Sequence, residues 1–233
     1  MEFLSDVWLQ IREHYPELLR GYRTTILLAI ASMALAMLLG AVVSLMRTSE
    51  SRVLRFGSGS YVEFFRNTPL LVQLYFWFFA LPRLPRFDLP IYGHVDWLLS
   101  PIEAALLGLT LYTGAYTSEA LRSGLLSIDK GQTEAARALG MSYIQTRLFV
   151  VIPQALRIAV PLLTSIFSAL FRNTAIVSVV GVSELLLTAD RIQQQNFQTV
   201  ELFAVAGVMY LSLTLPLALA SARLERWAAR SSA

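Results

Sequence analysis

The stretch TTILLAIASMALAMLLGAVVSLM, residues 24–46, decides the fold class of this chain. It contains no charged residue, and Arg23 and Arg47 stand at its two ends. About 20 apolar residues in an α-helix are enough to cross the hydrocarbon core of a bilayer, so we interpret residues 24–46 as a membrane span. Small residues recur at every fourth position, which predicts a face that a second helix approaches closely: Ser32, Ala36, Gly40 and Ser44.

The whole chain has the composition of a membrane protein. Of its 233 residues, 55% are hydrophobic and 15% are charged, and its mean hydropathy is +0.56; soluble domains average about 25% charged residues. Residues 34–36 (ALA) fit a signal-peptide cleavage pattern, but the apolar run continues well past them, so we expect the segment to stay in place as a span. Four further stretches poor in charge complete a prediction of an all-α protein with five spans: residues 67–82, 101–121, 158–182 and 202–222.

The distribution of basic residues predicts the orientation, because Lys and Arg concentrate in cytoplasmic loops. With the N-terminus outside, 12 of the 19 basic residues fall on the inner side. We therefore predict a periplasmic N-terminus and a cytoplasmic C-terminus. Residues 1–20 carry apolar side chains at helical spacing and are interpreted as an N-terminal interfacial segment. Residues 1–233 are expected to form one transmembrane domain, with 57–60 (GSGS) as a flexible joint before the second span.

The residues present exclude most catalytic chemistry. The chain has no Cys and two His, which rules out thiolate sites and leaves too few His for a multi-His metal site. The one Lys, Lys130, lies between Asp129 and Gly131, so there is no phosphate-binding P-loop. Glu103 and Glu119 would stand about 24 Å apart on one helix and cannot act on one bond. We expect no catalytic residue, no bound cofactor and, since no dense basic block is present, no nucleic-acid partner.

The loop between the third and fourth predicted spans, residues 118–156, has a distinctive spacing. Glu134, Ala135 and Ala136 are followed by Gly140 and, nine residues later, by VVIP at 150–153. Helix-forming residues before a glycine predict two short helices, with Thr133 capping the first and Gly140 ending it. Taken alone, the pattern also fits a solvated helical hairpin that binds no partner.

This spacing resembles the cytoplasmic motif of the membrane subunits of bacterial ABC importers, and among them the polar amino acid permeases. The motif reads Glu-Ala-Ala, three residues, Gly, nine residues and Ile-x-Leu-Pro; here Val150 and Ile152 stand for Ile and Leu, and Pro153 matches. Three other stretches are similar to the same family, and the resemblance covers about residues 21–227: YVEFFRNTPLLVQ (61–73), GAYTSE (114–119) and PQALR (153–157).

The resemblance implies a fold, a location and partners. It implies a type I ABC importer permease fold in the bacterial inner (cytoplasmic) membrane, as a multi-pass transport subunit without an ATPase site of its own. Residues 118–156 would then be a coupling loop that docks on separate subunits, which bind ATP and Mg²⁺. The residues implied to couple are Glu134, Ala135, Ala136 and Gly140. The further partners implied are two ATP-binding subunits, a second permease subunit (the same or a sister chain) and a periplasmic amino acid-binding protein.

Polar residues inside spans indicate a substrate path, because such residues usually face the bundle interior or a water-filled cavity. Arg172, Asn173 and Thr174 interrupt the fourth predicted span in its outer half. Arg172 either contacts the carboxylate of an amino acid or extends outward to the interface. Similar permeases often carry Lys-Asp-Thr-Ser here, so Asn173 in place of Asp favours an acidic or neutral substrate over a cationic one.

Five more residues are candidates for this path: Gln73, Thr110, Thr113, Tyr116 and Thr117. The three threonines share one helix face and either contact substrate or bond back to helix carbonyls. Two other functions are compatible with an apolar chain. A gradient-driven carrier or channel is expected to show intramembrane charge pairs or inverted repeats, whereas Arg172 has no obvious carboxylate partner in its own span. A membrane-anchored interaction protein would tolerate replacement of Arg172 and Asn173.

Overall fold

The computed structural model describes residues 2–83, 88–89, 93–94 and 98–230. Within them the chain is helical apart from the connecting loops and a short antiparallel pair of strands, β1 (Asp88–Leu89) and β2 (Gly93–His94), with Asp88 opposite His94. The helices follow in the order α1 (Glu2–Arg47), α2 (Arg52–Asn67), α3 (Leu70–Tyr75), α4 (Pro101–Leu126), α5 (Lys130–Ala138), α6 (Tyr143–Thr146), α7 (Ile152–Asn173), α8 (Leu185–Asn196) and α9 (Thr199–Arg230).

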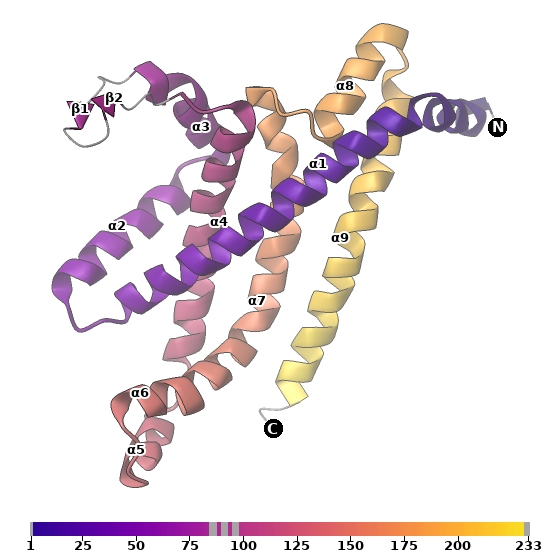
Figure 1. The fold of residues 1–233 in the computed structure, drawn as a ribbon. Helices are drawn as coiled ribbons and strands as arrows, with labels where there is room; N and C mark the ends of the chain where they lie inside the picture. Colours follow the sequence, from indigo (N-terminus) through magenta and orange to yellow (C-terminus); the bar gives the residue numbers. More distant parts are fainter. Residues whose placement is uncertain (1, 84–87, 90–92, 95–97, 231–233) are drawn as a thin grey trace.

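Short turns of other helix types extend two of these helices, α3 and α7. A π-helical turn (Phe76–Ala80) and a 3₁₀ turn (Leu81–Arg83) follow α3, and a π-helical turn (Arg147–Val151) leads into α7. A 3₁₀ turn (Thr174–Val180) follows α7. In Figure 1, α5 and α6 lie at the same end of the molecule as the C-terminus, while α8 and the N-terminus lie at the other end.

Among the described residues, three helical segments are long and apolar enough to cross a membrane: Val7–Arg47, Tyr143–Val180 and Thr199–Leu224. They contain the first and fifth predicted spans and all of the fourth except residues 181–182. The third predicted span falls on α4, which begins at Pro101 as expected. Its start is fixed by Ser100, whose hydroxyl accepts from the Glu103 amide while the Glu103 carboxylate accepts from the Ser100 amide.

The second predicted span, residues 67–82, corresponds to one short apolar segment that starts three residues after the predicted start. Helix α2 ends at Asn67, Thr68 is extended, and α3 begins after Pro69, leaving a short apolar segment from Leu70 to Arg83. Proline lacks an amide hydrogen and pushes the residue before it out of the helical region, which accounts for the break. The predicted flexible joint at residues 57–60 is wrong: it lies inside α2, where the Ser58 hydroxyl donates to the Leu54 carbonyl at 2.5 Å.

The stripe of small residues on α1 lies in a close contact with another helix, as predicted. Ser32, Ala36, Gly40 and Ser44 are all buried, and α1 crosses α4 (Figure 1). A Cβ atom added to Gly40 would lie 2.6 Å from Thr117 Cγ2 and 3.0 Å from the Ser118 amide nitrogen. Only glycine permits this approach, so the prediction of a close helix–helix face is confirmed.

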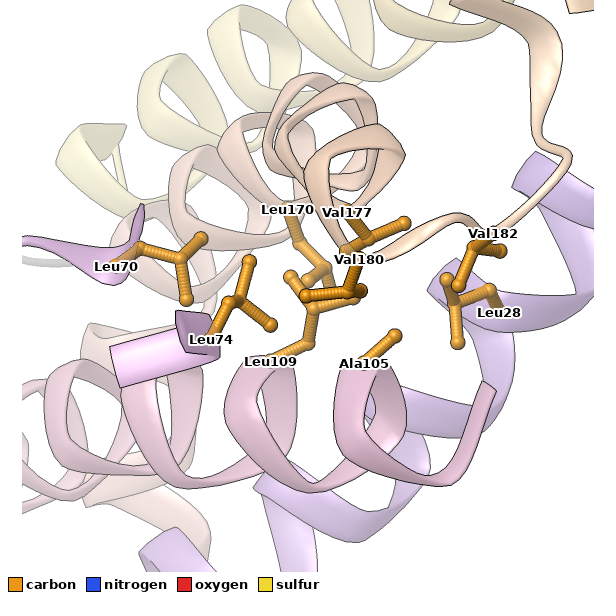
Figure 2. Packing of buried hydrophobic residues seen from close by; sticks show 9 residues of the cluster. All are labelled: Leu28, Leu70, Leu74, Ala105, Leu109, Leu170, Val177, Val180 and Val182. Atoms are coloured by element: carbon orange, nitrogen blue, oxygen red, sulfur yellow. The ribbon is translucent and has the colours of Figure 1, made fainter. Parts of the chain in front are cut away.

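The main apolar core joins segments that are distant in the sequence. Figure 2 shows Leu70 and Leu74 of α3 facing Leu109 and Ala105 of α4, with Leu170 and the valines of the turn after α7 closing the cluster. Leu74, Leu109 and Val177 have no exposed surface. This core fixes the irregular turn after α7 against α3 and α4.

The N-terminal part of α1 belongs to a second cluster. Pro16 lies inside α1 without ending it, and Val7 and Ile11 pack against the buried residues that α8 and α9 contribute. Where α8 begins, the fully buried Glu184 accepts hydrogen bonds from the amides of Leu186 (2.9 Å) and Leu187 (2.8 Å) and from the Tyr210 hydroxyl. Residues 7–20 are therefore held by tertiary contacts with α8 and α9.

Candidate functional site

The segment that carries the Glu-Ala-Ala spacing folds as two short helices, as predicted. Helix α5 starts at Asp129, whose carboxylate accepts from the Gly131 amide at 2.6 Å. The predicted cap at Thr133 is wrong, because Asp129 is an equally good capping residue one turn earlier and Thr133 lies within α5. Gly140 adopts a left-handed conformation with φ of +83° and ends this turn of chain, as its sequence position indicated.

Helix α6 begins with its own reciprocal cap, formed by Ser142 and Gln145. The Ser142 amide donates to the Gln145 side chain at 2.8 Å, and the Gln145 amide donates to the Ser142 hydroxyl at 3.3 Å. With Asp129 and Gly140 these caps define the backbone of the whole segment, so its shape follows from local sequence.

The outer surface of this segment combines one free carboxylate with apolar side chains. Glu134 and Ala135 are exposed, whereas Ala136 is 5% exposed and packs inward. Within the described part of the chain, Glu134 makes no hydrogen bond or ion pair. Large apolar side chains that a solvated hairpin would not display are exposed nearby: Leu139, Tyr143, Ile144, Leu148 and Phe149.

The segment is joined firmly to the long helices. A Cβ atom added to Gly124 of α4 would lie 2.5 Å from the Ala155 carbonyl oxygen of α7, so the two backbones nearly touch just before the segment leaves α4. The Gln154 side chain of α7 donates to the Gln132 side chain of α5 at 3.4 Å. Helix α5 is therefore linked to α7 by a side-chain hydrogen bond, and α7 packs closely on α4.

A charge cluster missed by the sequence analysis lies at the same end. Glu119 of α4 accepts from both Arg47, at the end of α1, and Arg122, one turn further along α4. Arg47 and Glu119 are 72 positions apart, and only the packing of α1 on α4 brings them together. Glu103 caps the opposite end of α4, so the expectation that the two glutamates stand apart is met.

The polar triplet of the fourth predicted span lies where regular helix ends. Helix α7 ends at Asn173, and the 3₁₀ turn begins at Thr174. Arg172 is exposed and its guanidinium donates to the Ser168 hydroxyl at 3.4 Å, so the side chain reaches back along α7. Thr174 is fully buried and its hydroxyl donates to the Phe171 carbonyl at 2.7 Å.

The other substrate-path candidates lie in separate places. Gln73 is buried and bridges the break after α2, donating to the carbonyls of Phe65 and Thr68, both at 3.0 Å. Tyr116 packs on Arg66, whose guanidinium carbon lies 5.3 Å from the ring centre.

The three threonines of α4 lie mostly where this helix packs against its neighbours. Thr113 and Thr117 are buried, and Thr117 meets Gly40 of α1. The hydroxyls of Thr110 and Thr117 are buried without a hydrogen-bond partner among the described residues. The candidates therefore lie in three places: the α2–α3 break, the α1–α4 contact and the end of α7. Of these candidates, Arg172 is the exposed one.

Comparison with known proteins gives a consistent result. Residues 32–230 match the family described as "Binding-protein-dependent transport system inner membrane component". The chain is 37% identical to the probable glutamine ABC transporter permease protein GlnP of Bacillus subtilis (strain 168), over 92% of this chain and 94% of that protein. It is 35% identical to the glutamate transport system permease protein GluC of Corynebacterium glutamicum, over 95% and 97% of the two chains.

Solved structures agree in fold. The crystal structure of an amino acid ABC transporter with histidines contains a chain that matches with a TM-score of 0.81 and 30% identity, covering 94% of this chain and 97% of that one. A chain of the MetNI methionine ABC transporter in an inward-facing conformation matches with a TM-score of 0.75 at 20% identity, over 93% of this chain and 98% of that one.

Proposed function

The chain belongs to the family of binding-protein-dependent transport system inner membrane components and is a permease subunit of an ABC importer, and on this premise we propose that it carries a polar amino acid into the cell. Relatives named for glutamine and glutamate transport match along nearly its full length. ATP hydrolysis belongs to a separate subunit of such importers. The observation that carries the dependence on a separate ATPase is the exposed segment α5–α6, with its free Glu134.

We propose that α5 and α6 form the surface on which an ATPase subunit docks. Glu134 is exposed and unpaired within the described part of the chain, so it can form a charge-assisted hydrogen bond to a partner. Ala135 is exposed and has only a methyl group, which allows a neighbouring surface to approach closely, while Ala136 fixes the helix on this chain. Gly140 allows the turn that presents the apolar residues of α6 beside the glutamate.

The same proposal defines the partners and the topology. We propose that two permease chains, two ATPase subunits that bind ATP and Mg²⁺, and a periplasmic amino acid-binding protein form the importer. Five segments cross the inner membrane: α1, the short apolar segment Leu70–Arg83, α4, α7 and α9, with the N-terminus outside. The placement of α5, α6 and the C-terminus at one end, opposite the N-terminus, supports this orientation (Figure 1).

For the substrate path we propose a contact at the end of α7. Arg172 is exposed in this chain and Asn173 follows where the helix changes type, an arrangement that transporters use at substrate sites. Arg172 supplies a positive charge for the substrate carboxylate. Asn173, which is neutral, favours an acidic or neutral amino acid over a cationic one. Gln73, Thr110, Thr113, Tyr116, Thr117 and Thr174 then shape and position the helices along the path.

Uptake by reconstituted proteoliposomes tests this function. We expect labelled glutamine or glutamate to accumulate only when the permease, its ATPase, the binding protein and internal ATP are all present, and to do so equally with an ionophore that removes ion gradients. Accumulation by the permease alone, driven by an imposed gradient and abolished by the ionophore, would instead identify a carrier.

A further inference from the structure

A cavity of about 280 Å³ lies between the ends of the long helices α1 and α4 and the segment formed by α5 and α6, called the coupling segment below. The ends of α1 and α4 form one part of its wall, and α5, α6 and the turn before α7 form the rest. Its basic lining residues are Arg47, Arg122, Lys130, Arg137 and Arg147, and no acidic residue lines it among those that the structure describes. This cavity does not include Glu134 and Ala135, the exposed α5 residues that we propose for docking, although Tyr143 borders both surfaces.

The positive charge of the cavity is only partly neutralised. Arg47 and Arg122 share the single carboxylate of Glu119. Arg147 lies over the Tyr143 ring, with 5.2 Å between the guanidinium carbon and the ring centre. Lys130 and Arg137 make no ion pair within the described part of the chain. Thr146, which is 1% exposed, also lines the cavity, and its hydroxyl has no hydrogen-bond partner among the described residues.

An apolar groove continues from this cavity along the long helices. It has a volume of about 110 Å³ and is lined by residues of α1, α4 and α7, among them Ala41, Leu121 and Leu156. Leu125 lines both the basic cavity and the groove. Positive charge therefore lies at the end of the long helices, and an apolar groove adjoins it at Leu125.

We propose that this combined site binds an anionic phospholipid. The phosphate lies in the basic cavity, where arginine side chains form paired hydrogen bonds to phosphate oxygens, and an acyl chain follows the apolar groove past Leu125. A bound lipid would touch α1, α4 and the coupling segment at once. It would therefore stabilise the position of the segment relative to the membrane helices.

Native mass spectrometry of the purified full chain tests the lipid site without ATP or an ATPase. The double variant Lys130→Gln/Arg137→Gln removes the two cations that have no carboxylate partner among the described residues. Its matched control, Arg52→Gln/Arg223→Gln, removes the same charge from exposed positions on α2 and α9. We expect phosphatidylglycerol to bind wild type and control equally, and to bind the double variant at least tenfold more weakly. Phosphatidylcholine should not saturate any of the three.

Three outcomes would overturn the lipid assignment. The first is equal affinity of wild type and both variants for phosphatidylglycerol, and the second is saturable binding of phosphatidylcholine with the same affinity as phosphatidylglycerol. The third is displacement of the lipid by millimolar inorganic phosphate, which would identify a soluble phosphate as the ligand. The melting temperature of each protein in detergent provides a second readout: phosphatidylglycerol should raise it for wild type and control and leave it unchanged for the double variant. Because no transport is measured, failure of the lipid site is separate from failure of the proposed function.

Discussion

Replacing Glu134 with lysine is expected to reduce ATP-driven uptake by at least about thirtyfold, because it reverses the free charge of the docking surface. A central charged residue of a protein interface contributes about 2 kcal/mol or more, and 1.4 kcal/mol corresponds to a tenfold change. The side chain is exposed and has no partner within the described part of this chain, so the permease itself should fold and insert normally. Uptake by proteoliposomes with equal amounts of permease measures the effect.

A control at another exposed glutamate separates a docking defect from a general effect of charge. Glu50 lies between α1 and α2, is exposed, and is expected on the same side of the membrane. Glu50→Lys changes the net charge by the same amount and should leave uptake within about twofold of wild type, as expected of a surface residue outside an interface. Equal losses in the two variants would show that the position of the charge is irrelevant, and the docking assignment would be wrong.

Replacing Glu184 with alanine is expected to lower the free energy of unfolding by about 3 kcal/mol or more. The carboxylate accepts hydrogen bonds from the Leu186 and Leu187 amides and from the Tyr210 hydroxyl, and it is fully buried. Alanine leaves three partly buried donors without this acceptor, and each unpaired buried donor costs about 1–3 kcal/mol. Thermal melting of the purified permease in detergent measures the loss as a fall in melting temperature.

Glu103→Ala is the matched control for this stability effect. Glu103 also caps a helix, but it is exposed, and water can replace its hydrogen bonds to Ser100. Loss of an exposed cap costs about 1 kcal/mol, so its melting temperature should fall much less. If both variants melted at the same temperature, the burial of Glu184 would contribute nothing to stability, and its three hydrogen bonds would be worth no more than those of an exposed cap.

The sequence predicted well those features that depend on neighbouring residues. The uncharged run at 24–46 lies within one helix, and the four-residue spacing of small side chains predicted a close helix contact, which the structure shows to be with α4. The two short helices and the left-handed Gly140 were also predictable, because capping and glycine conformations are local properties.

The errors arose where two local signals competed. Asp129 and Thr133 are both acceptable caps, and only the structure shows that α5 starts at the first of them. The glycines at 57 and 59 suggested a joint, but their α2 positions are free of neighbouring atoms and Ser58 is buried, so packing on one face keeps the helix intact. At Pro69 the uncharged run took the start of the second predicted span back to Asn67, whereas proline ends α2 there and the apolar segment starts at Leu70.

Residues whose role depends on distant contacts could not be found from the sequence. Glu119 meets Arg47 only because α1 crosses α4, and Glu184 meets Tyr210 only because α8 packs on α9. The same holds for the basic cavity: four of its five cations lie within residues 118–156, but only folding brings Arg47 beside them. No periodicity or motif along the chain marks these partners.

Site-directed photocrosslinking tests most directly whether α5 and α6 contact the ATPase. Because the chain has no cysteine, one cysteine at Ala135 can carry a photoreactive group, with Gly59 on the open face of α2 as the control position. In membranes that contain the assembled importer, we expect the probe at 135 to form a covalent product with the ATPase subunit and the probe at 59 to form none. Labelling of lipid alone from position 135, or a stronger product from position 59, would contradict docking through α5 and α6.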